Sequence, residues 1–133
     1  MTIVLIAVLA LLPVFGRYQV GVGRASSRRF YRLVRSSPPT LDDFTSQKAK
    51  GIPMARPDPE VALLWDGISV YATEAQARSQ ARSKPWLGAY IAELTISEDD
   101  PITFRRSGTS RGHHTLWGTP AELQARVTRL VRV

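Results

Sequence analysis

The sequence predicts an α+β fold: a small mixed or antiparallel sheet with short helices between its strands, in a single domain after a non-globular N-terminus. Three observations predict it. Short runs of aromatic and β-branched residues alternate along the chain with segments that carry helix-start signals. The length of 133 residues fits one domain. The chain has no Cys, which excludes a disulfide framework, a thiolate metal site and a Cys nucleophile.

The predicted strands are short, rich in branched or aromatic residues, and bounded by turn residues. In chain order they cover residues 30–35, 67–71, 90–96, 102–105, 115–117 and 126–133. We expect the segments at 30–35, 67–71 and 90–96 to share one sheet, because each combines these features.

The predicted helices follow residues that cap helix N-termini, with Pro or a Glu, Gln or Asp in the first turn. They begin after Thr40, at Asp58 or Pro59, after Thr73 and after Thr119; the first three end near Lys48, at Trp65 and before Pro85. Residues 51–59 hold three prolines and one glycine, which predicts a loop.

The formal net charge of +7 lies entirely in the first part of the chain. Residues 1–56 carry nine Lys or Arg against two Asp, whereas residues 57–133 carry nine basic and nine acidic side chains. A basic segment beside an apolar one is typical of a membrane-proximal stretch. The balanced remainder disfavours nucleic acid as a partner, although a basic N-terminal arm is a third hypothesis for binding it.

Residues 1–15 contain no charged side chain. A membrane-spanning helix needs about 20 such residues, so this segment is short for one. Three alternatives stay open: an anchor that contacts the membrane through residues 1–22 and holds a cytoplasmic domain at its inner face, an extension outside the native fold, and a core element. We divide the chain into an apolar segment with a basic linker, 1–27, and an α+β domain, 28–133, and expect residues 1–20 to add little to its stability.

Two adjacent histidines, His113 and His114, follow the Gly-containing loop 107–112. Neighbouring side chains on a strand point to opposite faces, so both cannot easily bind one metal, and we expect no metal site. A His between such a loop and a strand is well placed to contact a ligand. The alternative is a structural turn with a hydrogen-bonded His.

Polar residues recur on the predicted strands in a particular order. Arg32 lies on the first strand, and Ser69 and Tyr71 lie on the second, which leads through Thr73 into a helix. This order resembles the ADP-ribosyltransferase-like superfamily of NAD-binding α+β domains. The resemblance implies that Arg32 holds the NAD phosphates or ribose, and that Ser69, Tyr71 and Thr73 line the nicotinamide pocket.

At the third position of the superfamily pattern, this chain departs from the pattern. Where a transferase has Glu, this chain offers His113 or His114, or Glu93 on the preceding strand. The resemblance implies these three as catalytic candidates, NAD as the cofactor, and cleavage of the nicotinamide–ribose bond through an oxocarbenium-like transition state. From strand alternation alone, Glu93 is a solvent-facing strand residue.

The resulting hypothesis is a small NAD- or nucleotide-binding domain, active or degenerate, with a nucleotide-type small molecule as its ligand. We expect Arg32 and Tyr71 to stand on the same side of one pocket, joined by either His113 or His114. The alternative is a non-enzymatic interaction domain, membrane-anchored or cytosolic. Segments such as 112–118 also resemble those of short bacterial proteins of no assigned function.

Overall fold

The structure, a computed structural model, describes residues 26–56 and 58–133. Residues 28–96 and 100–133 form one compact unit. It contains every helix and strand discussed below, apart from the first residue of one strand, Ser27, and the last residue of another, Ser97. The predicted apolar segment and its membrane contact, residues 1–22, lie outside the described residues. Among the described helices, none has the length and apolar character needed to cross a bilayer.

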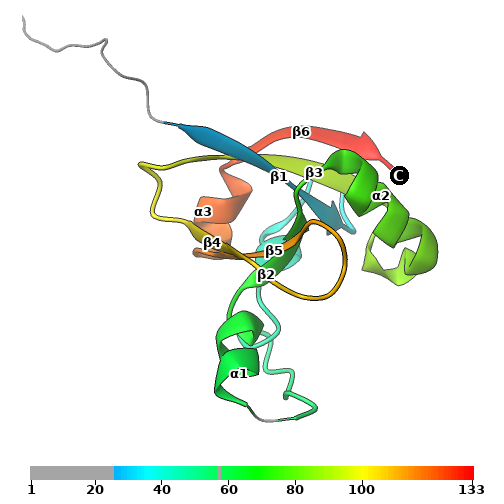
Figure 1. The fold of residues 1–133 in the computed structure, drawn as a ribbon. Helices are drawn as coiled ribbons and strands as arrows, with labels where there is room; N and C mark the ends of the chain where they lie inside the picture. The colour runs from blue at the N-terminus through cyan, green and yellow to red at the C-terminus, as the bar shows by residue number, and fades with distance from the viewer. Residues whose placement is uncertain (1–25, 57) are drawn as a thin grey trace, which may run out of the picture. The chain divides into compact units, whose positions relative to one another are not determined.

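The elements follow one another along the chain much as the sequence predicts (Figure 1). They are β1 Ser27–Val34, η1 Leu41–Phe44, α1 Pro59–Trp65, β2 Ile68–Tyr71, α2 Glu74–Ser83, η2 Pro85–Leu87, β3 Tyr90–Ser97, β4 Thr103–Arg106, β5 His113–Trp117, α3 Pro120–Gln124 and β6 Val127–Arg132. The α+β class is therefore confirmed. Some features differ from expectation: η2 has no counterpart in the predicted elements, and β1 and β5 begin earlier, at Ser27 and His113.

The first predicted helix is much shorter than expected. It is one 3-10 turn, Leu41–Phe44, and does not reach Lys48. An α-helix would need the Asp43 carbonyl to accept a hydrogen bond from a backbone N–H four residues later. Instead this carbonyl accepts from Nε of Arg32 at 2.8 Å, and the backbone at Thr45 is extended. The helix therefore ends where its Asp43 carbonyl contacts strand β1.

The six strands form one sheet in the order β4-β5-β2-β1-β3-β6. The pairs β1–β2, β2–β5, β4–β5 and β3–β6 are antiparallel. The three strands expected to share a sheet, β2, β1 and β3, are neighbours at its centre, which confirms that prediction. β2 is in register with β5 from Ile68 to Tyr71, whereas β1 and β2 share one registered pair, Tyr31 with Tyr71.

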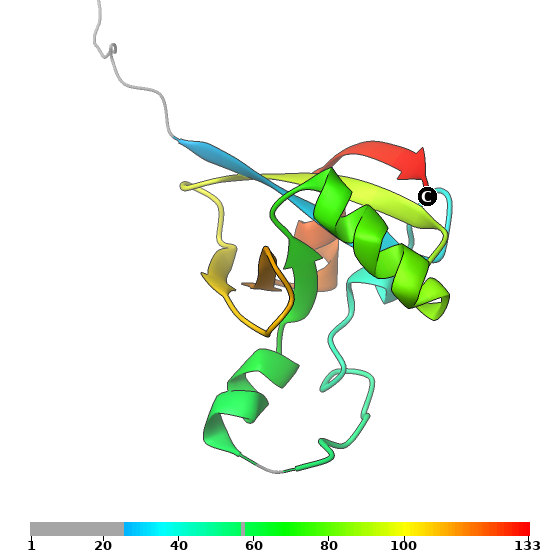
Figure 2. The same ribbon diagram turned by 45° about the vertical axis from the view of Figure 1, so that its right-hand side comes forward.

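Helices cover the sheet on both faces (Figures 1 and 2). On one face α2 contributes Ala77 and Ala81 to a cluster with Leu33, Tyr71 and Ile91. On the other face α3 and η1 enclose the larger core, whose fully buried members include Phe30, Val34, Phe44, Val70, Leu94, Leu116 and Leu123. Alternate residues of β1 therefore enter different cores, as the two-residue repeat of a strand requires.

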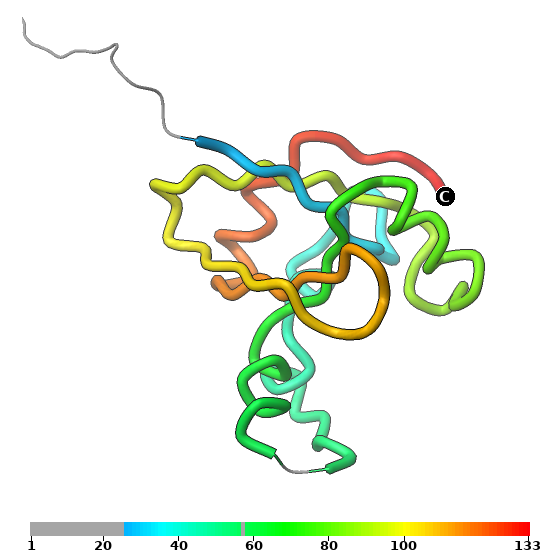
Figure 3. Tube along the Cα trace, in the orientation of Figure 1, coloured from blue at the N-terminus to red at the C-terminus, as the bar shows by residue number. Residues whose placement is uncertain are grey.

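Helix α1 and the segment before it extend away from the sheet (Figure 3). Asp58 caps the helix and accepts hydrogen bonds from the N–H groups of Glu60 and Val61. The helix has no buried residue, so hydrophobic packing contributes little to its position. Two indoles hold it instead: Trp65 donates to the Ile52 carbonyl at 2.7 Å, and Trp117 of β5 donates to the Leu63 carbonyl at 2.9 Å.

Candidate functional site

A cavity of about 540 Å³ lies beside the point where β1 and β2 pair. Its walls come from the ends of β1 and β2, from η1 and the residues after it, from the end of α2 and η2, and from the loop before β5. Four of the residues predicted from sequence line it together: Arg32, Ser69, Tyr71 and His113. Cavities of roughly 300–1,000 Å³ are the usual size of small-molecule sites.

Arg32 joins three elements at the wall of this cavity. Its Nε donates to the Asp43 carbonyl at 2.8 Å, and its Nη1 donates to the Ser69 carbonyl at 2.7 Å. β1 and β2 share a single registered pair, and the guanidinium adds a second connection between them through the Ser69 carbonyl. A guanidinium has five N–H donors, so three remain for a ligand.

Arg32 and Tyr71 both line the cavity, but strand alternation assigns them to different faces of the sheet. Alternation places Arg32 with Phe30 and Val34, whereas Tyr71 belongs to the cluster under α2. The long Arg32 side chain nevertheless lines the cavity and bonds the Ser69 carbonyl of β2. Removal from water lowers the pKa of Arg32 to about 10, with the nearby Asp43 acting in the opposite direction, so the side chain stays a cation at neutral pH.

Ser69 and Tyr71 lie two residues apart on β2 and therefore point to the same face. Tyr71 is buried, with 6% of its surface exposed, and its ring meets the His113 ring edge-on at 5.5 Å. Burial raises the pKa of the Tyr71 phenol, and Arg32 lowers it by a smaller amount. The phenol is therefore neutral at neutral pH and offers the cavity an uncharged aromatic wall.

His113 is fixed in one tautomer. Its Nδ1 lies 3.0 Å from the carbonyl oxygen of Ser107 and 3.1 Å from the Ser107 hydroxyl. A carbonyl oxygen only accepts, so Nδ1 carries the proton and Nε2 keeps its lone pair. Burial lowers the pKa of His113, and Lys84 and His114 lower it further against the effect of the Ser107 hydrogen bond. A neutral imidazole with a free acceptor nitrogen results.

A glycine permits this arrangement of the loop. Gly108 has a φ of 70°, in the left-handed region that favours glycine. A Cβ at this position would lie 2.8 Å from His113 Nδ1, closer than real side chains approach. The loop can therefore rest directly against the imidazole only because residue 108 has no side chain.

His114 and Thr73 are not part of the cavity lining. His114 is buried on the other face, with its ring 5.1 Å from that of Phe30 and its Nδ1 bonded to the Gly112 carbonyl. Thr73 caps α2, where its hydroxyl accepts a hydrogen bond from the Gln76 N–H at 3.1 Å. Of the two histidines the structure places one, His113, at the cavity.

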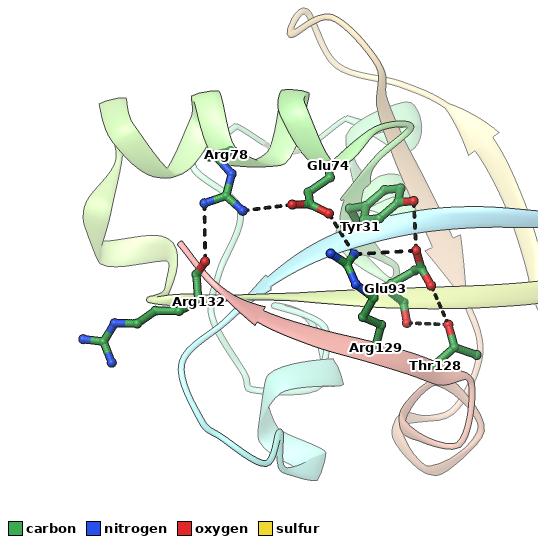
Figure 4. A network of polar contacts seen from close by, with 7 residues as sticks. All are labelled: Tyr31, Glu74, Arg78, Glu93, Thr128, Arg129 and Arg132. Atoms are coloured by element: carbon green, nitrogen blue, oxygen red, sulfur yellow. Dashed lines mark hydrogen bonds and ion pairs between the residues drawn. The ribbon is translucent and has the colours of Figure 1, made fainter.

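Glu93 is held in a separate polar network between α2, β1, β3 and β6 (Figure 4). Its carboxylate accepts hydrogen bonds from the Tyr31 hydroxyl at 3.1 Å and the Thr128 hydroxyl at 2.9 Å. Arg129 lies 4.0 Å from it and donates to Glu74 of α2 at 2.8 Å. The structure does not bring Glu93 to the cavity; it gives this residue a role in joining strands.

Several cavity residues were missed by sequence reasoning. The additional cations are Arg35, Lys50 and Lys84, and the additional aromatic is Trp86. A Trp in the short Lys84-Pro85-Trp86 connection, outside any predicted core, was the one available signal. Arg35 and Lys84 belong to different elements, and only the fold shows that they share a cavity.

The lining carries four Lys or Arg side chains and two Asp. Asp43 is buried and uses its carboxylate to accept from the backbone N–H groups of Arg35 and Thr40. Asp42 pairs with Lys50 at 3.6 Å. The cavity is therefore positive overall, which favours an anionic ligand.

Comparison of the chain with protein-family models, with curated proteins and with solved structures finds no match. Within residues 26–56 and 58–133, no three or more His, Asp or Glu side chains come together as metal ligands would. The candidate site is thus defined by its own geometry: a positive cavity with a neutral His, an uncharged aromatic wall and an Arg at the junction of two strands.

Proposed function

We propose that this chain is a small NAD- or nucleotide-binding domain of the ADP-ribosyltransferase-like type, with its ligand in the cavity beside β1 and β2. One observation supports the proposal above the others. Arg32, Ser69, Tyr71 and His113 come from three separate strands, were expected at one site from their order in the sequence, and line a single cavity.

Three of these side chains have chemistry that suits such a ligand. The Arg32 guanidinium has donors left for a phosphate, and charge-assisted hydrogen bonds of this kind are the stronger ones. Tyr71 offers an aromatic wall, and neutral His113 accepts a hydrogen bond from a ribose hydroxyl. Cleavage of the nicotinamide–ribose bond also requires a group that stabilises a developing cation. Glu93, one of the residues considered for this role, is held in the network of Figure 4 and does not line the cavity.

Calorimetric titration with ADP-ribose and with NAD tests the proposal. We expect dissociation constants in the micromolar range, weakened at least tenfold by Arg32→Ala, which corresponds to about 1.4 kcal/mol. Because Arg32 also joins strands, His113→Ala serves as a second variant, and thermal melting establishes that each variant is folded. Arg105→Ala is the matched control, since Arg105 lies on β4, pairs with Glu60 and does not line the cavity.

The opposite result is equally clear. If folded wild-type protein binds neither ligand at millimolar concentration, the nucleotide proposal is wrong, and the non-enzymatic interaction domain becomes the better interpretation. If the ligands bind but Arg32→Ala and His113→Ala have no more effect than Arg105→Ala, the ligand occupies a different place.

A further inference from the structure

Three of the residues that line the cavity, Arg35, Lys84 and Trp86, form what we call its mouth. One of them carries an unusually exposed indole. Trp86 lies on η2 and has 66% of its surface exposed, more than any other large hydrophobic residue among the described positions. An indole left in water forgoes the free energy of its burial, and exposed Trp side chains are common in binding surfaces. Trp65 and Trp117, by contrast, both use their N–H groups to hold α1.

Two cations lie close to Trp86 along the cavity lining. Arg35 follows β1, and its Nε donates to the Trp86 carbonyl at 3.2 Å, which fixes the guanidinium beside η2. Lys84 directly precedes η2, two residues before Trp86, and lines the same cavity. Of the ion pairs between described residues, none includes Arg35 or Lys84.

This combination matches the chemistry of single-stranded nucleic acid. A base stacks on an exposed aromatic ring with about 1–3 kcal/mol, while cations beside the ring attract the phosphates on either side. An acidic peptide would use Arg35 and Lys84 but would leave the indole face without a partner. We infer that the mouth of the cavity binds a single-stranded nucleic acid, with one base stacked on Trp86 and adjacent phosphates on Arg35 and Lys84.

The inference goes beyond the proposed function, because it assigns a polymer to a surface outside the four residues first predicted. It also revises the expectation drawn from charge. Counting along the chain placed Arg35 in the basic part and Lys84 in the balanced part, and so disfavoured nucleic acid. The fold brings the two cations to one mouth, where the local charge and not the sum over a segment acts on a ligand.

Fluorescence anisotropy with labelled single strands of about ten nucleotides, as DNA and as RNA, tests the inference in the full chain. We expect Trp86→Ala to weaken binding at least fivefold, and Arg35→Ala and Lys84→Ala each to reduce the salt dependence by about 0.7 in log–log slope. The basic residues of the N-terminal arm, such as Arg17 and Arg24, are present in every variant, so their contribution to binding cancels. Arg105→Ala is the control and should bind as the wild type does.

Two outcomes overturn the inference: Trp86→Ala binds single strands as tightly as Arg105→Ala, or a duplex of equal length binds as tightly as the single strand. Calorimetry with ADP-ribose on the same preparations keeps the proposals distinguishable. ADP-ribose binding without a Trp86-dependent oligonucleotide complex leaves the proposed function and removes the inference. A Trp86-dependent oligonucleotide complex without ADP-ribose binding leaves the inference and removes the proposed function.

Discussion

The Glu93 network and the cavity are two polar regions that share strand β1, and they differ in how their charges are used. In the network, Tyr31, Thr128 and Arg129 all face Glu93, and Arg129 also pairs with Glu74 (Figure 4). Each carboxylate of this network therefore has basic or hydroxyl partners within the protein. The cavity lining instead has more cations than carboxylates.

The difference separates structural polar groups from groups available to a ligand. A carboxylate that already accepts from two hydroxyls and lies near a guanidinium has little capacity left for a substrate. A cation with no carboxylate partner can bind an anion without first breaking an ion pair. Arg32 lies between these cases, since it spends two donors on strand carbonyls and keeps three.

The largest expected effect comes from Arg32→Ala. Two carbonyls would each lose a charged donor, and we expect a loss of about 3 kcal/mol in the free energy of unfolding, measured with urea. Arg35→Ala is the matched control, because Arg35 makes one exposed side-chain bond, to Trp86, and should cost less than about 0.5 kcal/mol. Equal losses in the two variants would contradict the joining role of Arg32.

Glu93→Ala should come next. It removes the acceptor of the Tyr31 and Thr128 hydroxyls, and we expect about 2 kcal/mol of destabilisation by the same measurement. ADP-ribose affinity should be unchanged, because Glu93 does not line the cavity. A stable variant that fails to bind would instead make Glu93 a ligand-contacting residue and remove the distinction between the two regions.

A pair of glycine variants tests the packing of the loop on His113. Gly51 and Gly108 both have positive φ, at 76° and 70°, but a Cβ at 51 meets nothing within 4 Å. Gly51→Ala therefore measures backbone strain alone. We expect Gly108→Ala to be less stable than Gly51→Ala by about 1 kcal/mol, since the loop must move off the imidazole. Identical thermal stabilities would show that the loop does not press on His113.

The smallest expected effect is the pH dependence from His113. Its pKa is lower in the folded than in the unfolded protein, so the unfolded state binds more protons as pH falls below about 6.5. The free energy of unfolding should therefore decrease between pH of about 7 and 5, and less steeply in His113→Gln. Urea unfolding across this range measures both slopes; a steeper decrease in the variant would contradict the neutral His113.

Local signals in the sequence were sufficient for most of the elements. Thr73 and Thr119 cap α2 and α3 through contacts three residues away, so their roles can be recognised without knowing the fold. Helix η1 shows the limit of such signals, because the Asp43 carbonyl at its end is bonded by Arg32 of strand β1. No local pattern could predict that the Asp43 carbonyl would be occupied.

The candidate site divides in the same way. Ser69 and Tyr71 share a face because they lie two apart on one strand, which the sequence alone predicts. The partners of Glu93 are 62 and 35 residues away in the chain, so its structural role depended on the sheet order. The position of Trp86 beside Arg35 also required the fold, since nothing in either segment points to the other.

Amide chemical shifts recorded during titration with ADP-ribose test most directly whether the cavity, and not the network, is the ligand site. The account predicts shifts that concentrate at Arg32, Ser69, Tyr71, Gly108 and His113, with those of Glu93 and Thr128 nearly unchanged. Shifts centred on Glu93 and Thr128, or no shifts at millimolar ADP-ribose in folded protein, would contradict it.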